Sequence, residues 1–268
     1  MEDRILVFIP MYNCEKQIVR VLNQFQGEIN GYVTEVIFVN NCSTDNGESA
    51  VIKKLSRMNC PFRVSVLRNH ENYGLGGSHK IAFQYAADHG FDYIIVLHGD
   101  DQGNIKDFLP LLHSGNYRKY DCCLGARFMR GSKLEGYSKV RILGNYGFNL
   151  LFSLVVKKRI YDLGSGLNLY KVSSLKNGYY EKFPDTLYFN DCMILAYCYY
   201  GQEMMFYPIS WREEDQVSNN KLLKFSVSLL KMLFHYLTGA GKYLGSEMRE
   251  KPVDSYLAEC VFEKEEQG

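Results

Sequence analysis

The sequence lacks a strong net charge, a long apolar run and an ordered cysteine pattern. Its 31 Lys and Arg residues nearly balance its 30 Asp and Glu residues, and the net charge of +1 argues against a general nucleic-acid-binding protein. No run of about 18 apolar residues is present, so no transmembrane helix is predicted, and the acidic start does not resemble a signal peptide. None of the eight cysteines forms a C-x-x-C pair, which favours a reduced, cytoplasmic protein over a disulfide framework or a zinc site.

Short apolar runs alternate with helical patterns through the first half of the 268 residues. Strands are predicted at 5–10, 35–40, 63–68, 93–98 and 122–127, and helices between them at 15–27, 46–57, 76–89 and 105–114. Nearly continuous apolar strands separated by helices predict an α/β domain with a mostly parallel sheet and helices on both faces. Ligands of such sheets bind beyond the carboxyl ends of the strands, and the pattern predicts a nucleotide-binding domain.

The second half of the chain is less regular. Helices are predicted at 138–156, 189–200 and 220–237, with strands in "DLGSGLNLYK" and "MMFYPIS". Residues after about 245 are charged and weakly patterned, which predicts a loosely ordered tail. The chain is therefore divided into one domain over 1–237 and a charged tail over 238–268.

The predicted strand at 93–98 ends on a cluster of oxygen ligands. Asp100, Asp101 and Gln102 follow it, at the edge of the sheet where a ligand would bind. Such hard oxygen donors suit Mg²⁺ or Mn²⁺ that bridges a protein carboxylate to a diphosphate. A solvated turn with an aspartate capping the next helix is the alternative, and the position in the sheet favours the metal.

Polar side chains also follow the first two predicted strands. Tyr12, Asn13 and Glu15 come after the first strand, and Asn41 and Asp45 come after the second. These side chains could bind a base and a ribose through hydrogen bonds, or they could be ordinary turn and capping residues.

The segment "YGLGGSHK" follows the third predicted strand. Its glycines, Gly74, Gly76 and Gly77, do not match the G-x-G-x-x-G pattern of dinucleotide-binding folds. Glycines that open a helix could admit a phosphate, and a tight strand-to-helix turn explains them equally well.

Seven segments, taken in order, resemble glycosyltransferase family 2 of the GT-A type, in its polyprenyl-phosphate sugar synthase (dolichol-phosphate mannosyltransferase-like) branch. They are "IPMYNCE", "VNNCSTD", "NYGLGGS", "LHGDDQ", "GARFMRG", "DLGSGLNLYK" and "SWREEDQVSN", and together they span about residues 4 to 225. The resemblance implies a Rossmann-like GT-A fold, a nucleotide-sugar donor, Mg²⁺ or Mn²⁺ as cofactor, and inversion at the anomeric carbon. It also implies a nucleotide-sugar half over 1–115 and an acceptor half over 116–237.

The resemblance also implies roles for individual residues. Asp100 matches the second, metal-binding aspartate of a D-x-D motif, Gln102 matches a glutamine near the metal, and His98 replaces the first aspartate. A neutral histidine suits Mn²⁺ better than Mg²⁺, and His98 could instead contact the nucleotide. The nucleotide-binding residues implied in this way are Pro10, Tyr12, Asn13, Glu15, Asn41, Asp45, Gly74, His98, Asp100 and Arg212.

The chemistry expected at the acceptor depends on what attacks. A sugar hydroxyl would need a carboxylate base, for which Asp191 is the first candidate and Asp162 the second, although Asp191 could simply be a helix N-terminal acid. A polyprenyl phosphate is already an anion and needs cations instead. Arg127 and Arg141 match arginines near the acceptor phosphate or the donor diphosphate, unless they form surface ion pairs. Arg212 lies in a segment that resembles a loop closing over the donor.

Two predicted helices bear on the acceptor. Polar residues recur on one face of the helix at 141–156, at Arg141, Asn145, Asn149 and Ser153. A basic stripe runs along the otherwise apolar helix at 220–237, at Lys221, Lys224, Ser228, Lys231 and His235. Packing in the core or in a homodimer is favoured for such a helix, and a lipid acceptor would favour an anionic membrane surface instead.

The sequence therefore predicts an inverting, metal-dependent glycosyltransferase. Its donor would be a UDP- or GDP-sugar and its acceptor a lipid-linked glycan or polyprenyl phosphate, in envelope polysaccharide or glycan biosynthesis. The protein would be cytoplasmic, with peripheral contact at the inner face of the cell membrane left open. The alternatives are a catalytically degenerate nucleotide- or glycan-binding protein and, less favoured because "PMYNCEKQ" has no glycine, a sugar-nucleotide nucleotidyltransferase.

Overall fold

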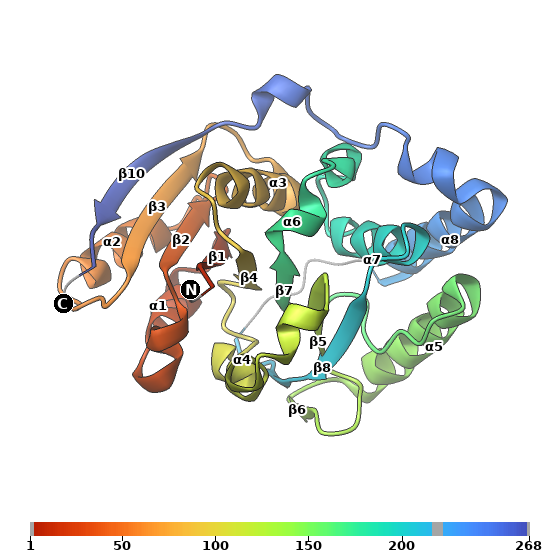
Figure 1. The fold of residues 1–268 in the computed structure, drawn as a ribbon, viewed down its shortest axis with the longest axis horizontal. Coiled ribbons are helices and arrows are strands. Elements are labelled where there is room, and N and C mark those ends of the chain that lie inside the picture. The colour runs from red at the N-terminus through yellow and green to blue at the C-terminus, as the bar shows by residue number, and fades with distance from the viewer. Residues whose placement is uncertain (1–2, 216–221, 267–268) are drawn as a thin grey trace.

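The computed structural model describes residues 3–215 and 222–266 and centres on an eight-stranded sheet (Figure 1). The strands, in sheet order, are β10 (Ala258–Lys264), β3 (Arg63–Asn69), β2 (Glu35–Asn40), β1 (Ile5–Met11), β4 (Tyr93–Leu97), β7 (Leu167–Lys171), β5 (Cys122–Ala126) and β8 (Met204–Pro208). Neighbours pair in parallel from β3 to β4 and between β5 and β8, whereas β7 is antiparallel to β4 and β5. The prediction of a mostly parallel α/β sheet is confirmed, with β7 and β10 as antiparallel members. A separate two-stranded sheet pairs β6 (Lys133–Glu135) with β9 (Ser210–Arg212).

Helices cover both faces of the sheet because its central strands are apolar on both sides. The helices are α1 (Glu15–Leu22), α2 (Gly47–Leu55), α3 (Gly74–Asp88), α4 (Leu109–Ser114), α5 (Lys139–Val156), α6 (Val172–Leu175), α7 (Phe189–Tyr199) and α8 (Leu222–Leu244). In β1, Ile5, Val7 and Ile9 join the core under α1, α2 and α4, whereas Leu6 and Phe8 join the core under α3, α6, α7 and α8 (Figure 1). Short 3₁₀ turns lie at Gly27–Tyr32, Ile105–Phe108, Asn116–Lys119, Tyr179–Lys182 and Val253–Ser255.

The end of the chain differs from its prediction as a loosely ordered tail. β10 pairs antiparallel with β3 and completes the edge of the sheet next to it. An uncovered β3 would leave a row of unpaired backbone N–H and C=O groups, and β10 supplies partners for them. Glu259 and Glu263 of β10 pair with Arg68 and Arg63 of β3. The sequence alone suggested a solvated tail, because the arginine partners of these glutamates lie far away in the sequence.

Three helices differ in their boundaries from the predicted ranges. The predicted helix at 15–27 ends at Leu22, and the predicted helix at 105–114 begins with a 3₁₀ turn. The helix predicted at 220–237 continues to Leu244, across non-helical backbone at Gly239. Lys221, part of its predicted basic stripe, and the side chain of Lys224 lie outside the described part of the chain.

Candidate active site

The loops that follow β1 and β2 are locked together by hydrogen bonds. Thr44 N donates to Asn13 Oδ1 (2.8 Å), and Glu15 N donates to Asp45 Oδ2 (2.8 Å). In return, Glu15 Oε2 accepts a hydrogen bond from Asn46 N (3.2 Å). The structure therefore brings Asn13, Glu15 and Asp45 together at the carboxyl end of the sheet, where parallel sheets bind ligands.

Strained backbone is concentrated at the same edge. Gly99 N donates to Pro10 O (3.2 Å), which joins the segment after β4 to the end of β1. Among the described residues, three of the four non-glycine residues with positive φ lie in these loops, at Asn13 (50°), Cys42 (56°) and Asp101 (60°). Such conformations persist where the surroundings hold them, and they cluster at functional sites. This edge is therefore the candidate active site.

Asn41 is tied to the neighbouring loop by every polar atom of its side chain. Its Nδ2 donates to Asn72 Oδ1 (2.8 Å), and its Oδ1 accepts from Asn69 Nδ2 (3.0 Å) and Tyr73 N (2.8 Å). Asn41 thus joins the end of β2 to the loop that opens α3. Tyr12, by contrast, is about half exposed at the rim. Contact of either residue with a nucleoside stays a prediction.

Glycines at the start of α3 allow another part of the same chain to approach. Gly74 has a φ of +66°, and a Cβ there would lie 2.3 Å from Asp185 O. Gly76 N donates to the same oxygen (2.7 Å), and a Cβ at Gly76 would lie 2.2 Å from Pro184 O. The segment at 184–185 fills the space beside these glycines, which supports the tight-turn interpretation. Nucleotide binding at Gly74 remains a prediction.

Two adjacent aspartates follow β4 and have different surroundings. Asp101 is fully buried and accepts hydrogen bonds from Arg20 Nε (2.7 Å) and Gln24 Nε2 (3.0 Å), and it pairs with Arg212. Asp100 is half-buried, and burial together with the Asp101 carboxylate raises its pKa to about 6. Asp101 is therefore an anchor between α1 and β9, whereas Asp100 is a carboxylate whose ionised form a nearby cation would stabilise.

The donor set suits a hard divalent cation at Asp100. Its carboxylate lies two residues before the Gln102 amide, and oxygen ligands of this kind are those that Mg²⁺ and Mn²⁺ prefer. Mg²⁺ commonly takes only one or two protein carboxylates and completes its shell with substrate phosphates and water. Within 3–215 and 222–266, no group of three or more His, Cys, Asp or Glu side chains is arranged to hold a metal ion.

His98 lies against the core on the α3 side of the sheet. A Cβ on Gly166 would lie 2.6 Å from His98 Cγ, and the His98 ring is edge-on to His79 at 6.3 Å between centroids. Burial and the Arg127 charge lower its pKa to about 4, so the ring is neutral at pH 7. Its Nε2 is buried, and none of the described residues offers it a hydrogen bond. Metal ligation or nucleotide contact by His98 stays a prediction.

Arg127 is a buried cation directly after β5. Its Nε and Nη2 donate to Asp162 Oδ2 and Oδ1, both at 2.7 Å, and its backbone N donates to Asp162 Oδ2 (2.8 Å). The rings of Phe128, Tyr137 and Trp211 lie 5.0 to 5.8 Å from the guanidinium carbon. Asp162 therefore holds Arg127 in place, and its oxygens are occupied by these donors, which is unfavourable for a general base.

Asp191 lies in the first turn of α7 and is buried. Burial and the neighbouring Asp162 charge raise its pKa well above the usual range, because both disfavour the ionised carboxylate. The preceding residue, Asn190, has a buried Oδ1 that pairs with no residue in the described part of the chain, and it lines a small cavity with Asp162 and Asn168. Sequence reasoning missed Asn190, because nothing local distinguishes it from a solvent-facing amide.

Ion pairs tie β9 and the described residues that follow it to α1 and α5. Arg20 bridges Asp101 and Asp215, with Nη2 donating to Asp215 Oδ1 (2.9 Å). Arg141, at the start of α5, donates through Nη1 to both oxygens of Glu213 (2.6 and 2.7 Å). Arg212, the last residue of β9, pairs with Asp101, and Glu213, the next residue, pairs with Arg141. These two pairs connect the segment to the loop after β4 and to α5. The roles of Arg20 and Asp101 were missed because Arg20 lies on α1, 81 residues away.

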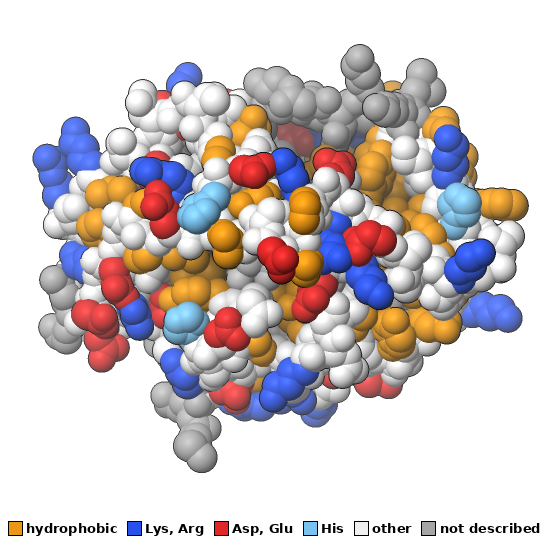
Figure 2. Space-filling model, turned by 90° about the horizontal axis from the view of Figure 1, so that it is seen from above, with side chains coloured by type: hydrophobic (Ala, Val, Ile, Leu, Met, Phe, Trp, Pro, Cys, Tyr) orange, Lys and Arg blue, Asp and Glu red, His pale blue; other side chains and the backbone are white. Residues whose placement is uncertain are grey.

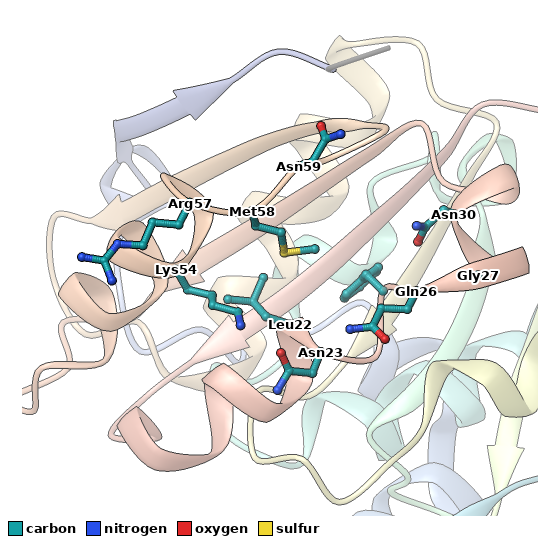
Figure 3. Close-up of a pocket in the computed structure, with 10 residues that line it drawn as sticks. Leu22, Asn23, Gln26, Gly27, Asn30, Lys54, Arg57, Met58 and Asn59 are labelled. Carbon is teal, nitrogen blue, oxygen red and sulfur yellow. The ribbon is translucent and has the colours of Figure 1, made fainter.

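A pocket lies away from the candidate active site, beside the C-terminal ends of α1 and α2 (Figure 3). Its volume is about 570 Å³, and its walls include Asn23, Gln26, Lys54 and Arg57. None of the residues proposed for the active site lines it. The two regions are therefore separate features of the fold.

Comparison with known proteins identifies the family. The model of glycosyl transferase family 2 matches residues 6–178, more than half of the chain. This chain belongs to glycosyl transferase family 2. Family 2 membership makes it a glycosyltransferase, as the sequence predicts.

Individual relatives are more distant. The chain is 29% identical over 175 residues to an uncharacterized protein of Methanocaldococcus jannaschii, covering 65% of this chain and 68% of that protein. It is 24% identical over 187 residues to UDP-N-acetylglucosamine–dolichyl-phosphate N-acetylglucosaminyltransferase of Methanococcus voltae, covering 66% and 73%. Glucosyl-3-phosphoglycerate synthase of Mycobacterium tuberculosis, solved with Mn²⁺ and UDP-glucose, superposes with a TM-score of 0.62 at 16% identity, over 88% of this chain and 79% of that one. This structural likeness confirms the predicted GT-A type fold.

Proposed function

We propose that this family 2 glycosyltransferase is an inverting, metal-dependent enzyme that transfers a sugar from a UDP- or GDP-sugar to a polyprenyl phosphate or lipid-linked glycan. The observation that carries the proposal is the Asp100 carboxylate, half-buried at the carboxyl end of the sheet beside the joined loops of β1 and β2. A transferase named for a dolichyl-phosphate acceptor is among its relatives. Its place would be envelope polysaccharide or glycan biosynthesis at the inner face of the cell membrane.

The chain's own residues would divide the work of binding. Pro10, Tyr12 and the joined Asn13 and Glu15 would receive the nucleoside. Asp100, Gln102 and the donor diphosphate would hold Mg²⁺ or Mn²⁺, which neutralises charge on the departing nucleoside diphosphate. The segment after β9 would cover the donor, with Arg212 near the diphosphate.

Two observations favour a phosphate as the nucleophile over a hydroxyl group. Burial raises the pKa of Asp191, which disfavours the ionised form that a base needs, and the carboxylate of Asp162 already accepts hydrogen bonds from Arg127. A polyprenyl phosphate needs no base, since its oxygen already carries negative charge. Arg127 and Arg141 would instead orient that phosphate through charge-assisted hydrogen bonds, using guanidinium N–H groups other than those that pair with Asp162 and Glu213.

The test is calorimetric titration of UDP and GDP into the protein with Mn²⁺, Mg²⁺ or EDTA. We expect one nucleotide to bind with a Kd on the order of micromolar, only with metal, and not to Asp100→Ala. Asp88→Ala, at an exposed position near the end of α3, is the control. Binding that is indifferent to metal and to Asp100→Ala would remove the metal site, and no binding would remove the transferase mechanism. Nucleotide binding without any donor turnover would assign the degenerate, non-catalytic alternative.

Asp191→Asn separates the two kinds of acceptor. Asparagine keeps the size of the side chain and cannot accept a proton as a base, so transfer to polyprenyl phosphate should stay within roughly threefold of wild type, whereas loss of a required base lowers kcat by about 10²- to 10⁴-fold. The measurement is initial rate with a short-chain polyprenyl phosphate. A loss in that larger range, with the melting temperature unchanged, would restore Asp191 as the base.

A further inference from the structure

Helices α5 and α8 each leave one apolar face open. The open side chains of α5 are Val140, Leu143, Leu150, Leu151 and Leu154, and those of α8 are Val227, Leu230, Phe234 and Leu237. They are between 41% and 77% exposed. Spacings of three, four and seven residues place most of each set on one side of its helix. A soluble monomer rarely exposes two such apolar stripes on neighbouring helices, and such surfaces mark interaction sites.

The opposite faces of both helices are already packed. Leu229, Met232 and Leu233 of α8 and Phe152 of α5 are buried in the core under α3 and α7. The two helices contact each other and lie at the same end of the molecule (Figure 1). The core of this domain is therefore already covered by the other faces of the two helices. The prediction that the helix at 220–237 packs in the core describes only one side of α8.

The segments that contain these two helices carry basic residues and no acidic ones. Residues 136–161 and 222–246 hold 8 of the 31 Lys and Arg residues and none of the 30 Asp and Glu residues, which leaves 23 basic against 30 acidic residues elsewhere. Viewed from above, hydrophobic, basic and histidine side chains occupy the end where α8 lies, and acidic side chains lie toward the middle and the other end (Figure 2). Glu213, which pairs with Arg141, is an acidic side chain beside α5, and the excess of charge along the two helices is basic. An apolar face beside such a basic excess matches the surface of an anionic bilayer.

A groove in this region combines both properties. It lies between the C-terminal half of α5 and the loops at 128–130 and 157–161, with a volume of about 760 Å³. Arg130, Lys157, Lys158 and Arg159 line it together with apolar side chains that include Leu150 and Leu154. Four cations beside an apolar wall suit a phosphate headgroup joined to an acyl or isoprenoid chain.

We propose that the open faces of α5 and α8 dock this enzyme on an anionic lipid bilayer, with lipid phosphates received in the groove beside α5. The inference rests on the proposed function, because a lipid acceptor is met at a membrane. A second copy of this chain is a poorer occupant, since a two-fold dimer would place the same basic patch against itself. None of the described helices is long and apolar enough to cross a membrane, so the contact is at the surface.

The experiment is co-sedimentation of the full chain with vesicles of phosphatidylcholine alone or with about a third phosphatidylglycerol. We expect at least about tenfold tighter binding to the anionic vesicles, weakening as salt is raised. One variant carries Leu143→Glu, Leu150→Glu and Leu154→Glu on α5, and another carries Leu230→Glu and Phe234→Glu on α8. Each should lose at least about tenfold in vesicle affinity, as expected for charges placed at a bilayer contact. The control, Val253→Glu with Leu257→Glu, changes equally exposed side chains near the chain end and should bind as wild type.

Nucleotide titration without vesicles separates this inference from the proposed function. Vesicle binding without nucleotide binding overturns the function and keeps the surface, whereas nucleotide binding without a preference for anionic vesicles overturns the surface. Wild-type vesicle affinity in either docking variant, both folded by melting curve, also overturns it. A lipid-free dimer that the α5 variant dissociates would assign the face to a second copy and reject the membrane.

Discussion

An Asp100→Asn variant is expected to lose about 10²- to 10³-fold in transfer rate while unfolding at a higher temperature than wild type at pH 7. Asparagine keeps the shape and can still accept the hydrogen bond that Gln102 N gives to Asp100 Oδ1 (3.2 Å). It has no charge to hold a divalent cation, so stabilisation of the leaving diphosphate is lost. Rate assays with saturating Mn²⁺ and thermal melting on the same samples measure the two effects.

The gain in stability follows from the raised pKa of Asp100. Burial moves that pKa from 3.8 to about 6, so between these values the folded protein binds a proton that the unfolded chain has released. The carboxyl group therefore lowers stability progressively as pH rises from about 4 to 6, and the full penalty remains above. The melting-temperature gap between Asp100→Asn and wild type should widen over that interval and then stay constant.

Asp88→Asn is the matched control, because this exposed carboxylate lies near the end of α3 and outside the site. It should leave rate and melting temperature at wild-type values. Full activity with unchanged metal dependence in Asp100→Asn would show that the cation is held elsewhere. A constant melting-temperature gap at every pH would show that the burial of this carboxylate is not what limits stability.

The second large effect is expected on stability. Asp162→Ala should lower the free energy of unfolding by about 3 to 5 kcal/mol, because it leaves Arg127 charged and unpaired in the protein interior. Arg127 is only 8% exposed, and two of its side-chain nitrogens and its backbone N donate to Asp162. Urea unfolding followed by circular dichroism gives the difference.

An ion pair whose carboxylate is half exposed provides the comparison. Glu247→Ala removes the partner of Arg249 near the surface and should change the free energy of unfolding by about 1 kcal/mol or less. Replacing both buried partners, as Arg127→Met with Asp162→Leu, should recover much of the loss, since no charge is left unpaired. Equal losses for Asp162→Ala and Glu247→Ala would contradict the structural role given to the buried pair.

Local sequence patterns are enough to predict most strands and helices in the first half of the chain. The strands β1 to β5 and helices α2 and α3 lie within about two residues of their predicted ranges, because each depends on a short apolar run or a helical repeat. Helix α1 ends earlier than predicted, and α4 begins after a 3₁₀ turn. The placing of Asp100 and Gln102 just beyond a buried strand follows for the same reason. Sheet topology then brings these residues to the edge shared by the loops after β1 and β2.

The sequence by itself therefore determined the α/β class, the family and the strand ends that form the candidate site. Only the tertiary structure decided which charges pair. Asp101 meets Arg20 and Arg212, Asp162 meets Arg127, and β10 joins β3 across most of the chain length. The local sequence around an aspartate in a turn does not tell whether its carboxylate faces water, a metal ion or an arginine. Its burial and pKa depend on partners that are distant in sequence. The open faces of α5 and α8 likewise became visible only once packing had used their other sides.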